Sequence, residues 1–135
     1  MSIANLPIPK ERSLFLHDQI NQISVKSTIE SIDAINKDDT HLVKLYNLYG
    51  LDYKPQPLEL NINSFGGDVY SMFALCNKIE SSPVPVYTIV SGCAMSAAFL
   101  ISISGHKRFA YHNSTFMYHQ TFYGMFGKFE SIKED

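Results

Sequence analysis

The stretch LELNINSFGGDVYSMFALCNKI, residues 58–79, changes from one periodicity to another across a pair of glycines. Its first six residues alternate apolar and polar side chains, which is typical of a strand with one buried face. SFGGD follows as a tight turn, and residues 69–79 then place their apolar side chains on one helical face. The prolines of SSPVP end this helix, and VYTIV (86–90) predicts a second, buried strand. The stretch therefore predicts a strand–helix–strand unit.

The flanking segments continue this alternation of strands and helices. Before the unit, we expect a strand at 13–20, an amphipathic helix at 24–36 capped by Ser24, and a helical turn and loop over 38–57. After it, we expect a turn at Ser91–Gly92, a helix over Ala94–Ser102, and strands at 108–112 and 115–119. The pattern predicts an α/β fold in one domain, residues 1–135, with functional groups at the carboxyl ends of the strands.

Composition excludes several classes of function. The chain has 135 residues, a hydrophobic fraction of 45% and a formal net charge of -2, so no basic field attracts nucleic acid. Its two cysteines, Cys76 and Cys93, match no metal-ligand spacing and no disulfide framework. We therefore expect no metal or other cofactor and a reducing, cytoplasmic setting, and the N-terminus lacks a secretory signal pattern.

Residues 81–105 carry no charge and are long enough to span a bilayer. Pro83, Pro85, Gly92 and several serines interrupt the segment, which predicts two buried elements joined by a turn. We therefore expect no membrane segment.

Three features carry groups suited to catalysis. Ser96 follows a predicted turn near a helix start, where a serine can act as a nucleophile once a base removes its proton. Gly66–Gly67 lies between a strand and a helix, where glycine lets a backbone N–H approach a ligand closely. His119 ends a predicted strand and is a candidate base. Each also has an ordinary structural interpretation, and spacing alone does not select His119 over the other histidines, His17, His41, His106 and His112.

Taken together and in order, four blocks of sequence resemble the Clp protease proteolytic subunit family. They are PKERSLFL (9–16), LNINSFGGDV (60–69), SGCAMSAAFL (91–100) and KRFAYHNSTFMYHQ (107–120). The resemblance implies a crotonase-like α/β fold of stacked ββα/βαβ units and a serine endopeptidase that cleaves unfolded proteins to peptides. It implies Ser96 as the nucleophile, His119 as the base, and the N–H groups of Gly67 and Ala97 as oxyanion donors.

The family resemblance also implies partners and a location. Its members form heptameric rings, homo- or hetero-oligomeric, and an AAA+ unfoldase that consumes the ATP feeds them unfolded chains. The setting is cytoplasmic, or the plastid stroma for an organellar member.

The sequence departs from the family most clearly at its C-terminus, because the family's triad aspartate lies well beyond Asp135. We therefore expect a truncated chain, with reduced activity or none. A non-catalytic structural subunit of a mixed ring is one alternative, and Glu130 or Asp135 orienting His119 is another. A crotonase-type acyl-CoA enzyme using Asp68 is a third. Cys93, three residues before Ser96, is either a rival nucleophile or a small buried residue.

Overall fold

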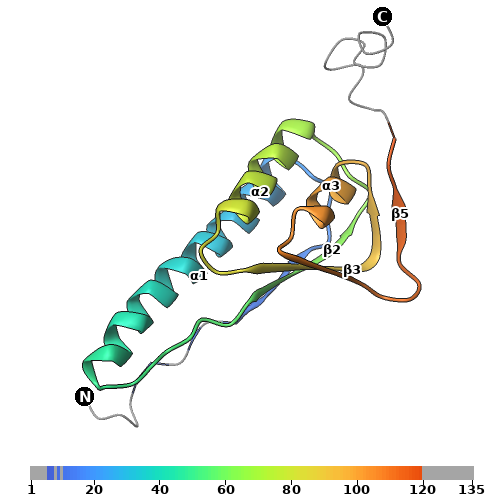
Figure 1. Ribbon diagram of the computed structural model, residues 1–135. Helices are drawn as coiled ribbons and strands as arrows, with labels where there is room; N and C mark the ends of the chain where they lie inside the picture. The colour runs from blue at the N-terminus through green and yellow to red at the C-terminus, as the bar shows by residue number, and fades with distance from the viewer. Residues whose placement is uncertain (1–5, 8, 10, 120–135) are drawn as a thin grey trace, which may run out of the picture.

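The computed structural model describes residues 6–7, 9 and 11–119, which form a parallel sheet of five strands covered by three helices (Figure 1). Within this part of the chain the sheet order is β1-β2-β3-β4, β5 pairs with the far end of β3, and every strand pair is parallel. The predicted α/β architecture is confirmed. The elements are β1 (Ser13–Leu16), α1 (Gln22–Leu48), β2 (Leu58–Ser64), α2 (Val69–Ser81), β3 (Val86–Met95), α3 (Ala97–Ile103), β4 (Lys107–Ala110) and β5 (Thr115–Met117).

Strand β2 forms the centre of the core. Leu58, Leu60 and Ile62 are 0% exposed and face the helices, whereas Glu59 and Asn63 on the opposite face are exposed. This is the alternation that the sequence predicted for 58–63. Burial of each such side chain contributes roughly 1.5–3 kcal/mol, so β2 anchors the turn that follows it. Helix α2 lies between α1 and α3 and contacts both.

Helix α1 spans 27 residues, a length of about 40 Å, so the predicted helix at 24–36 was too short. Asn21, not Ser24, is the N-cap. The Asn21 side chain accepts a hydrogen bond from the Ser24 N–H, and the Ser24 hydroxyl accepts one from the Asn21 N–H. Ser24 is therefore the third residue of a reciprocal capping box.

The C-terminal part of α1 continues through residues expected to form a loop, because a buried carboxylate there is neutralised. Asp39 is only 2% exposed, and Arg12 donates hydrogen bonds to both of its carboxylate oxygens. The Tyr53 hydroxyl donates a third, of 2.9 Å. The hydrogen bond to Asp39 raises the pKa of the Arg12 guanidinium, and burial raises the pKa of Tyr53. This cluster joins three segments that are distant in sequence.

Strand β3 is also longer than predicted and continues through Ser91–Gly92, where a turn was expected. Its first half pairs with β2 and β4, and its last residues, Cys93–Met95, pair with β5. Helix α3 consequently starts at Ala97 rather than Ala94. The uncharged segment 81–105 thus forms mainly one strand and one short helix, and no helix among the described residues is long and apolar enough to cross a membrane.

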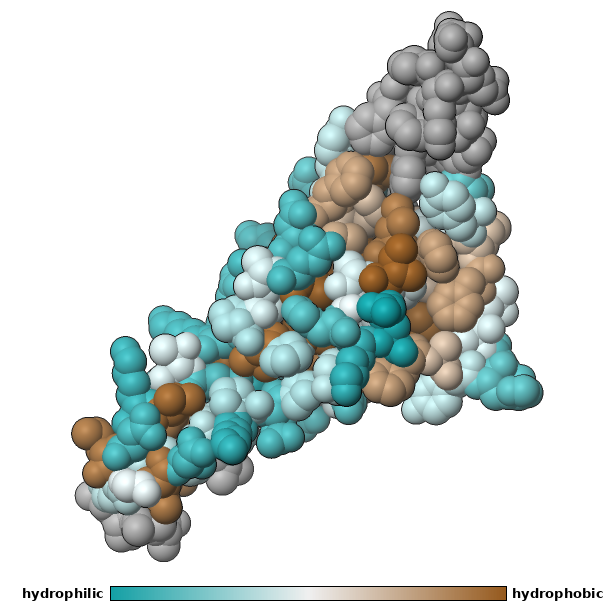
Figure 2. Space-filling view, viewed as in Figure 1, coloured by the Kyte–Doolittle hydropathy of each residue, from teal (hydrophilic) through white to brown (hydrophobic). Residues whose placement is uncertain are grey.

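The carboxyl ends of β2, β3 and β5 meet at one end of the sheet, where α2 and α3 begin (Figure 1). Figure 2 shows mainly polar side chains over the middle of the molecule, and apolar side chains toward the α3 and β5 end as well as at the opposite end. Large apolar residues exposed at this end are Phe65, Phe73, Phe116, Met117 and Tyr118. The end that holds the predicted functional residues therefore also presents apolar surface.

Candidate functional site

The glycine turn after β2 has one backbone edge paired and one edge open. The N–H of Ile20 donates to the Gly66 carbonyl at 2.9 Å, and the N–H of Asp68 donates to the Ile20 carbonyl at 2.6 Å. Because the N–H and C=O of one residue in such a segment point to the same side, those of Gly67 point away from Ile20. Within residues 11–119 the Gly67 N–H donates to no protein group. Among the described residues, therefore, no group competes with a ligand for this N–H.

The conformation of this turn requires glycine. Gly66 has φ +105° and Gly67 has φ +152°, both in the left-handed region. The Ser64 hydroxyl accepts a hydrogen bond from the Gly66 N–H at 3.1 Å and fixes the start of the turn. Ser64 is only 3% exposed, so this bond is shielded from water.

Ser96 has an unusual backbone conformation. With φ 55° and ψ -121°, it is the non-glycine residue with positive φ in the described part of the chain. It is the N-cap residue of α3, yet its side chain caps no helix N–H. Its own N–H donates to the Met117 carbonyl at 2.7 Å. Strained residues at a sharp strand-to-helix turn are characteristic of functional sites, because the turn presents the side chain away from the backbone.

The glycine turn packs directly against Ser96. A Cβ atom added to Gly66 would lie 3.0 Å from the Ser96 Cβ and 3.3 Å from the Ala97 N. Ala97 is the first residue of α3, and the first N–H groups of a helix have no partner within the helix. The structure therefore packs Gly66, the neighbour of Gly67, against Ser96 and against Ala97 at the start of α3.

His119 follows β5, the strand that pairs with the last residues of β3 just before Ser96. Met95 is paired with Met117, whose carbonyl accepts the Ser96 N–H, and His119 lies two residues further along the chain. His119 is exposed. The competing His106 has a structural contact instead, because its Nδ1 accepts the Val86 N–H at 3.0 Å. Gln120 and the predicted alternatives Glu130 and Asp135 lie outside the described residues.

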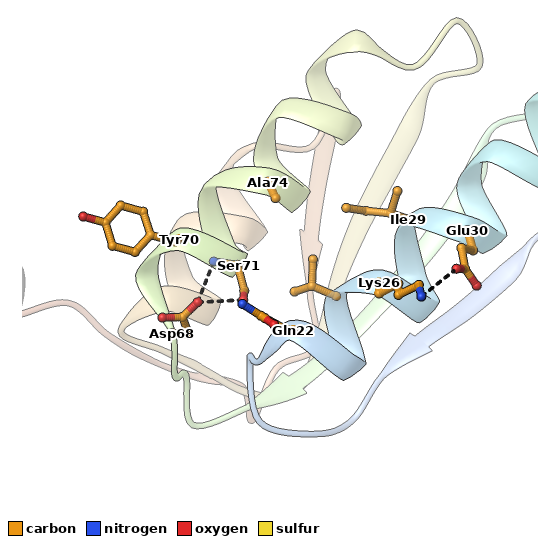
Figure 3. A pocket seen from close by; sticks show the side chains of 9 residues that line it. Gln22, Lys26, Ile29, Glu30, Asp68, Tyr70, Ser71 and Ala74 are labelled. Atoms are coloured by element: carbon orange, nitrogen blue, oxygen red, sulfur yellow. Dashed lines mark hydrogen bonds and ion pairs between the residues drawn. The ribbon is translucent and has the colours of Figure 1, made fainter.

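Asp68, the carboxylate that an acyl-CoA enzyme would need, is engaged as a helix cap. It accepts hydrogen bonds from the Ser71 hydroxyl at 2.7 Å and the Ser71 N–H at 2.8 Å, and these bonds lower the pKa of Asp68. Figure 3 shows Asp68 turned toward Ser71 at the rim of a hollow of about 530 Å³ between α1 and α2. None of Ser96, Ala97 and His119 lines this hollow.

The two cysteines have packing contacts. The Cys93 thiol lies 3.5 Å from the Ser64 carbonyl, and the Cys76 thiol lies 3.8 Å from the Leu100 carbonyl. Burial raises the pKa of Cys76, which disfavours the reactive thiolate there. Among the described residues, histidine, cysteine and carboxylate side chains form no group suited to hold a metal ion.

A family model described as Clp protease matches residues 7–135. The chain belongs to the Clp protease family. It is 33% identical over 117 residues to the ATP-dependent Clp protease proteolytic subunit 2 of Borreliella burgdorferi, which covers 83% of this chain and 59% of that protein. It is 35% identical over 126 residues to the proteolytic subunit 1 of Rhodopirellula baltica, covering 92% of this chain and 55% of that protein. The chain thus spans little more than half the length of these relatives.

Solved structures support the same fold. A ClpP1 mutant from Listeria monocytogenes superposes with a TM-score of 0.69 at 19% identity, covering 91% of this chain and 64% of the other. The ClpP protease catalytic domain from Plasmodium falciparum gives a TM-score of 0.63 at 25% identity, covering 85% of this chain and 59% of the other. The crotonase-like, ClpP-like α/β fold expected from the sequence blocks is therefore confirmed.

Proposed function

We propose that this chain is a serine peptidase subunit in which Ser96 is the nucleophile and His119 the general base. One observation carries the proposal: Ser96 is held in a strained conformation at the start of α3, in contact with the glycine turn that presents the Gly67 N–H. A strained serine beside two donors of this kind is the arrangement that acyl transfer requires.

In the proposed mechanism, the Ser96 hydroxyl oxygen attacks the carbonyl carbon of a peptide bond, and its proton passes to the imidazole of His119. The N–H groups of Gly67 and Ala97 donate to the oxyanion that develops. His119 then returns the proton to the departing amine, which leaves an acyl ester on Ser96. A water molecule, deprotonated by His119, hydrolyses this ester and restores the free hydroxyl.

The proposed substrate is an unfolded polypeptide. An extended chain can bind along the open edge of Gly67, where the N–H and C=O are directed away from Ile20. Apolar substrate side chains find an aromatic surface near Ser96, where the ring of Phe99 lies 6.1 Å from that of Phe116 and 5.9 Å from that of Tyr118. Folded proteins do not expose such extended apolar segments, so an AAA+ unfoldase that consumes ATP is the proposed partner of a heptameric ring.

A peptidase assay separates this proposal from a non-catalytic subunit. The purified chain, Ser96→Ala and His119→Ala are compared for hydrolysis of an unfolded protein and of a fluorogenic peptide. The proposal predicts slow turnover by the parent chain, none by Ser96→Ala, and a loss of about 10³-fold or more in His119→Ala, because an unactivated serine is a poor nucleophile. Turnover that persists in Ser96→Ala would exclude Ser96. A folded parent chain without turnover, alone and mixed with a full-length relative, would favour a structural subunit.

A further inference from the structure

Strands β2 and β3 lose their regular register just before the proposed site. Ile62 is paired with Val90, but the next pair joins Ser64 to Ala94, so β3 contains extra residues at this point. Asn63 is the residue of β2 that faces this irregular part of β3. Bulges of this kind redirect a strand and are common next to active sites.

The Asn63 side chain holds the bulge in shape. Its carbonyl oxygen accepts the N–H of Cys93 at 3.0 Å, which replaces the ladder hydrogen bond lost at the bulge. A Cβ atom on Gly92 would collide with this side-chain oxygen, so residue 92 must be glycine for Asn63 to reach Cys93. The backbone of residues 91–93 is thus fitted around the amide of Asn63.

The residues that Asn63 holds lead directly to the nucleophile. Cys93–Met95 pair with β5, and the next residue, Ser96, donates its N–H to Met117. On the other side, Asn63 adjoins Ser64, whose hydroxyl fixes the glycine turn. Asn63 therefore connects the strand that ends at the oxyanion donor with the strand that ends at the nucleophile.

We propose that Asn63 is a positioning residue of the peptidase site, which sets Ser96 against the Gly67 N–H by holding the backbone of Cys93. This inference rests on the proposed function for its catalytic consequence. Asn63 is exposed, so water can take over as acceptor when the side chain is removed, and the cost to global folding is small. Water cannot tie the two strands together. Because a shift of about 1 Å at a reacting group costs about 10²-fold in rate, the site is affected more than the fold.

The test compares four proteins: the parent, Asn63→Ala, Asn63→Asp and Asn61→Ala. Asn63→Asp keeps a side-chain acceptor for the Cys93 N–H. Asn61→Ala is the matched control, because Asn61 lies on the same face of β2 but its amide donates to the Leu14 carbonyl of β1 at 3.2 Å, away from β3. The readouts are hydrogen exchange at the Cys93 and Ser96 amides, the rate at which a fluorophosphonate probe labels Ser96, and the unfolding temperature.

We expect the probe to label Ser96 at least about tenfold more slowly in Asn63→Ala than in the parent and in Asn61→Ala. Hydrogen exchange at the Cys93 and Ser96 amides should be faster in Asn63→Ala than in those two proteins. The two alanine variants should have similar unfolding temperatures. In Asn63→Asp, the Cys93 and Ser96 amides should be protected from exchange as in the parent, and the probe should label Ser96 at a rate within about threefold of the parent's. Parent-like labelling and exchange in Asn63→Ala, or no recovery of protection in Asn63→Asp, would overturn the inference. If the probe fails to label the parent, the proposed function falls, and unchanged exchange at Ser96 in Asn63→Ala then overturns this inference separately.

Discussion

Replacing Gly66 by alanine tests how closely the glycine turn and the nucleophile are fitted. The new Cβ would lie 2.6 Å from the Met95 carbonyl oxygen, whereas ordinary contact begins at 3.4 Å, so one of the two segments must move by about 0.8 Å. A displacement of that order beside a reacting group costs about 10²-fold in rate. The φ of +105° adds backbone strain of about 1–3 kcal/mol. For a domain of this size, that strain lowers the unfolding temperature by about 3–15 °C.

Gly50→Ala is the matched control for this prediction. Gly50 also has positive φ, +71°, but a Cβ there meets nothing within 4 Å. The Gly50→Ala variant should lose about 1 kcal/mol in free energy of unfolding, or about 3–5 °C in unfolding temperature. A fluorophosphonate probe should label its Ser96 at the parent's rate. At a temperature where both variants are folded, the probe should label Ser96 about 10²-fold more slowly in Gly66→Ala than in Gly50→Ala. Equal labelling rates in the two variants would refute the contact between the glycine turn and Ser96.

Two further predictions concern stability, each measured by unfolding. Asp39→Ala leaves Arg12 without its buried partner and should lower the free energy of unfolding, measured in urea, by about 3 kcal/mol. Asp33→Ala, which removes an exposed ion pair, should lower it by less than about 1 kcal/mol. Equal losses in the two variants would contradict the buried cluster. Asp68→Ala should lower the unfolding temperature at pH 7, because the Ser71 hydrogen bonds depress the pKa of Asp68. This stabilisation is complete above the unfolded-state pKa of about 4 and is lost as the pH falls through the lowered folded-state pKa, so a difference in unfolding temperature that does not shrink as the pH falls below about 4 would contradict the assignment.

Local sequence patterns predicted the order of elements because the residues concerned act through near neighbours. The alternation in 58–63 and the helical spacing in 69–79 are properties of single elements, and both were correct. The glycine turn was also evident from Gly66–Gly67. The motif blocks then indicated the family, which no single block could do.

The errors arose where distant residues decide the structure. The polar run after Asn36 resembles a loop, but Asp39 is buried because Arg12, 27 residues earlier, binds its carboxylate. The strand β3 continues through Gly92 because Asn63 of the neighbouring strand fills the space beside it. Such pairings leave no periodic signal in the sequence. For the same reason the hydrogen bond between Asn63 and Cys93 was not predicted, although Asn63 belongs to the LNINSFGGDV block.

The role of Ser96 as the nucleophile is tested most directly by identifying the residue that a fluorophosphonate probe modifies. The purified chain is treated with the probe, digested and analysed by peptide mass spectrometry, with Ser96→Ala and His119→Ala treated in parallel and circular dichroism used to establish that each is folded. We expect one adduct, on Ser96, which is absent from Ser96→Ala and forms much more slowly in His119→Ala. A folded parent chain that carries no adduct at Ser96, or that carries its adduct on another residue, would contradict this role.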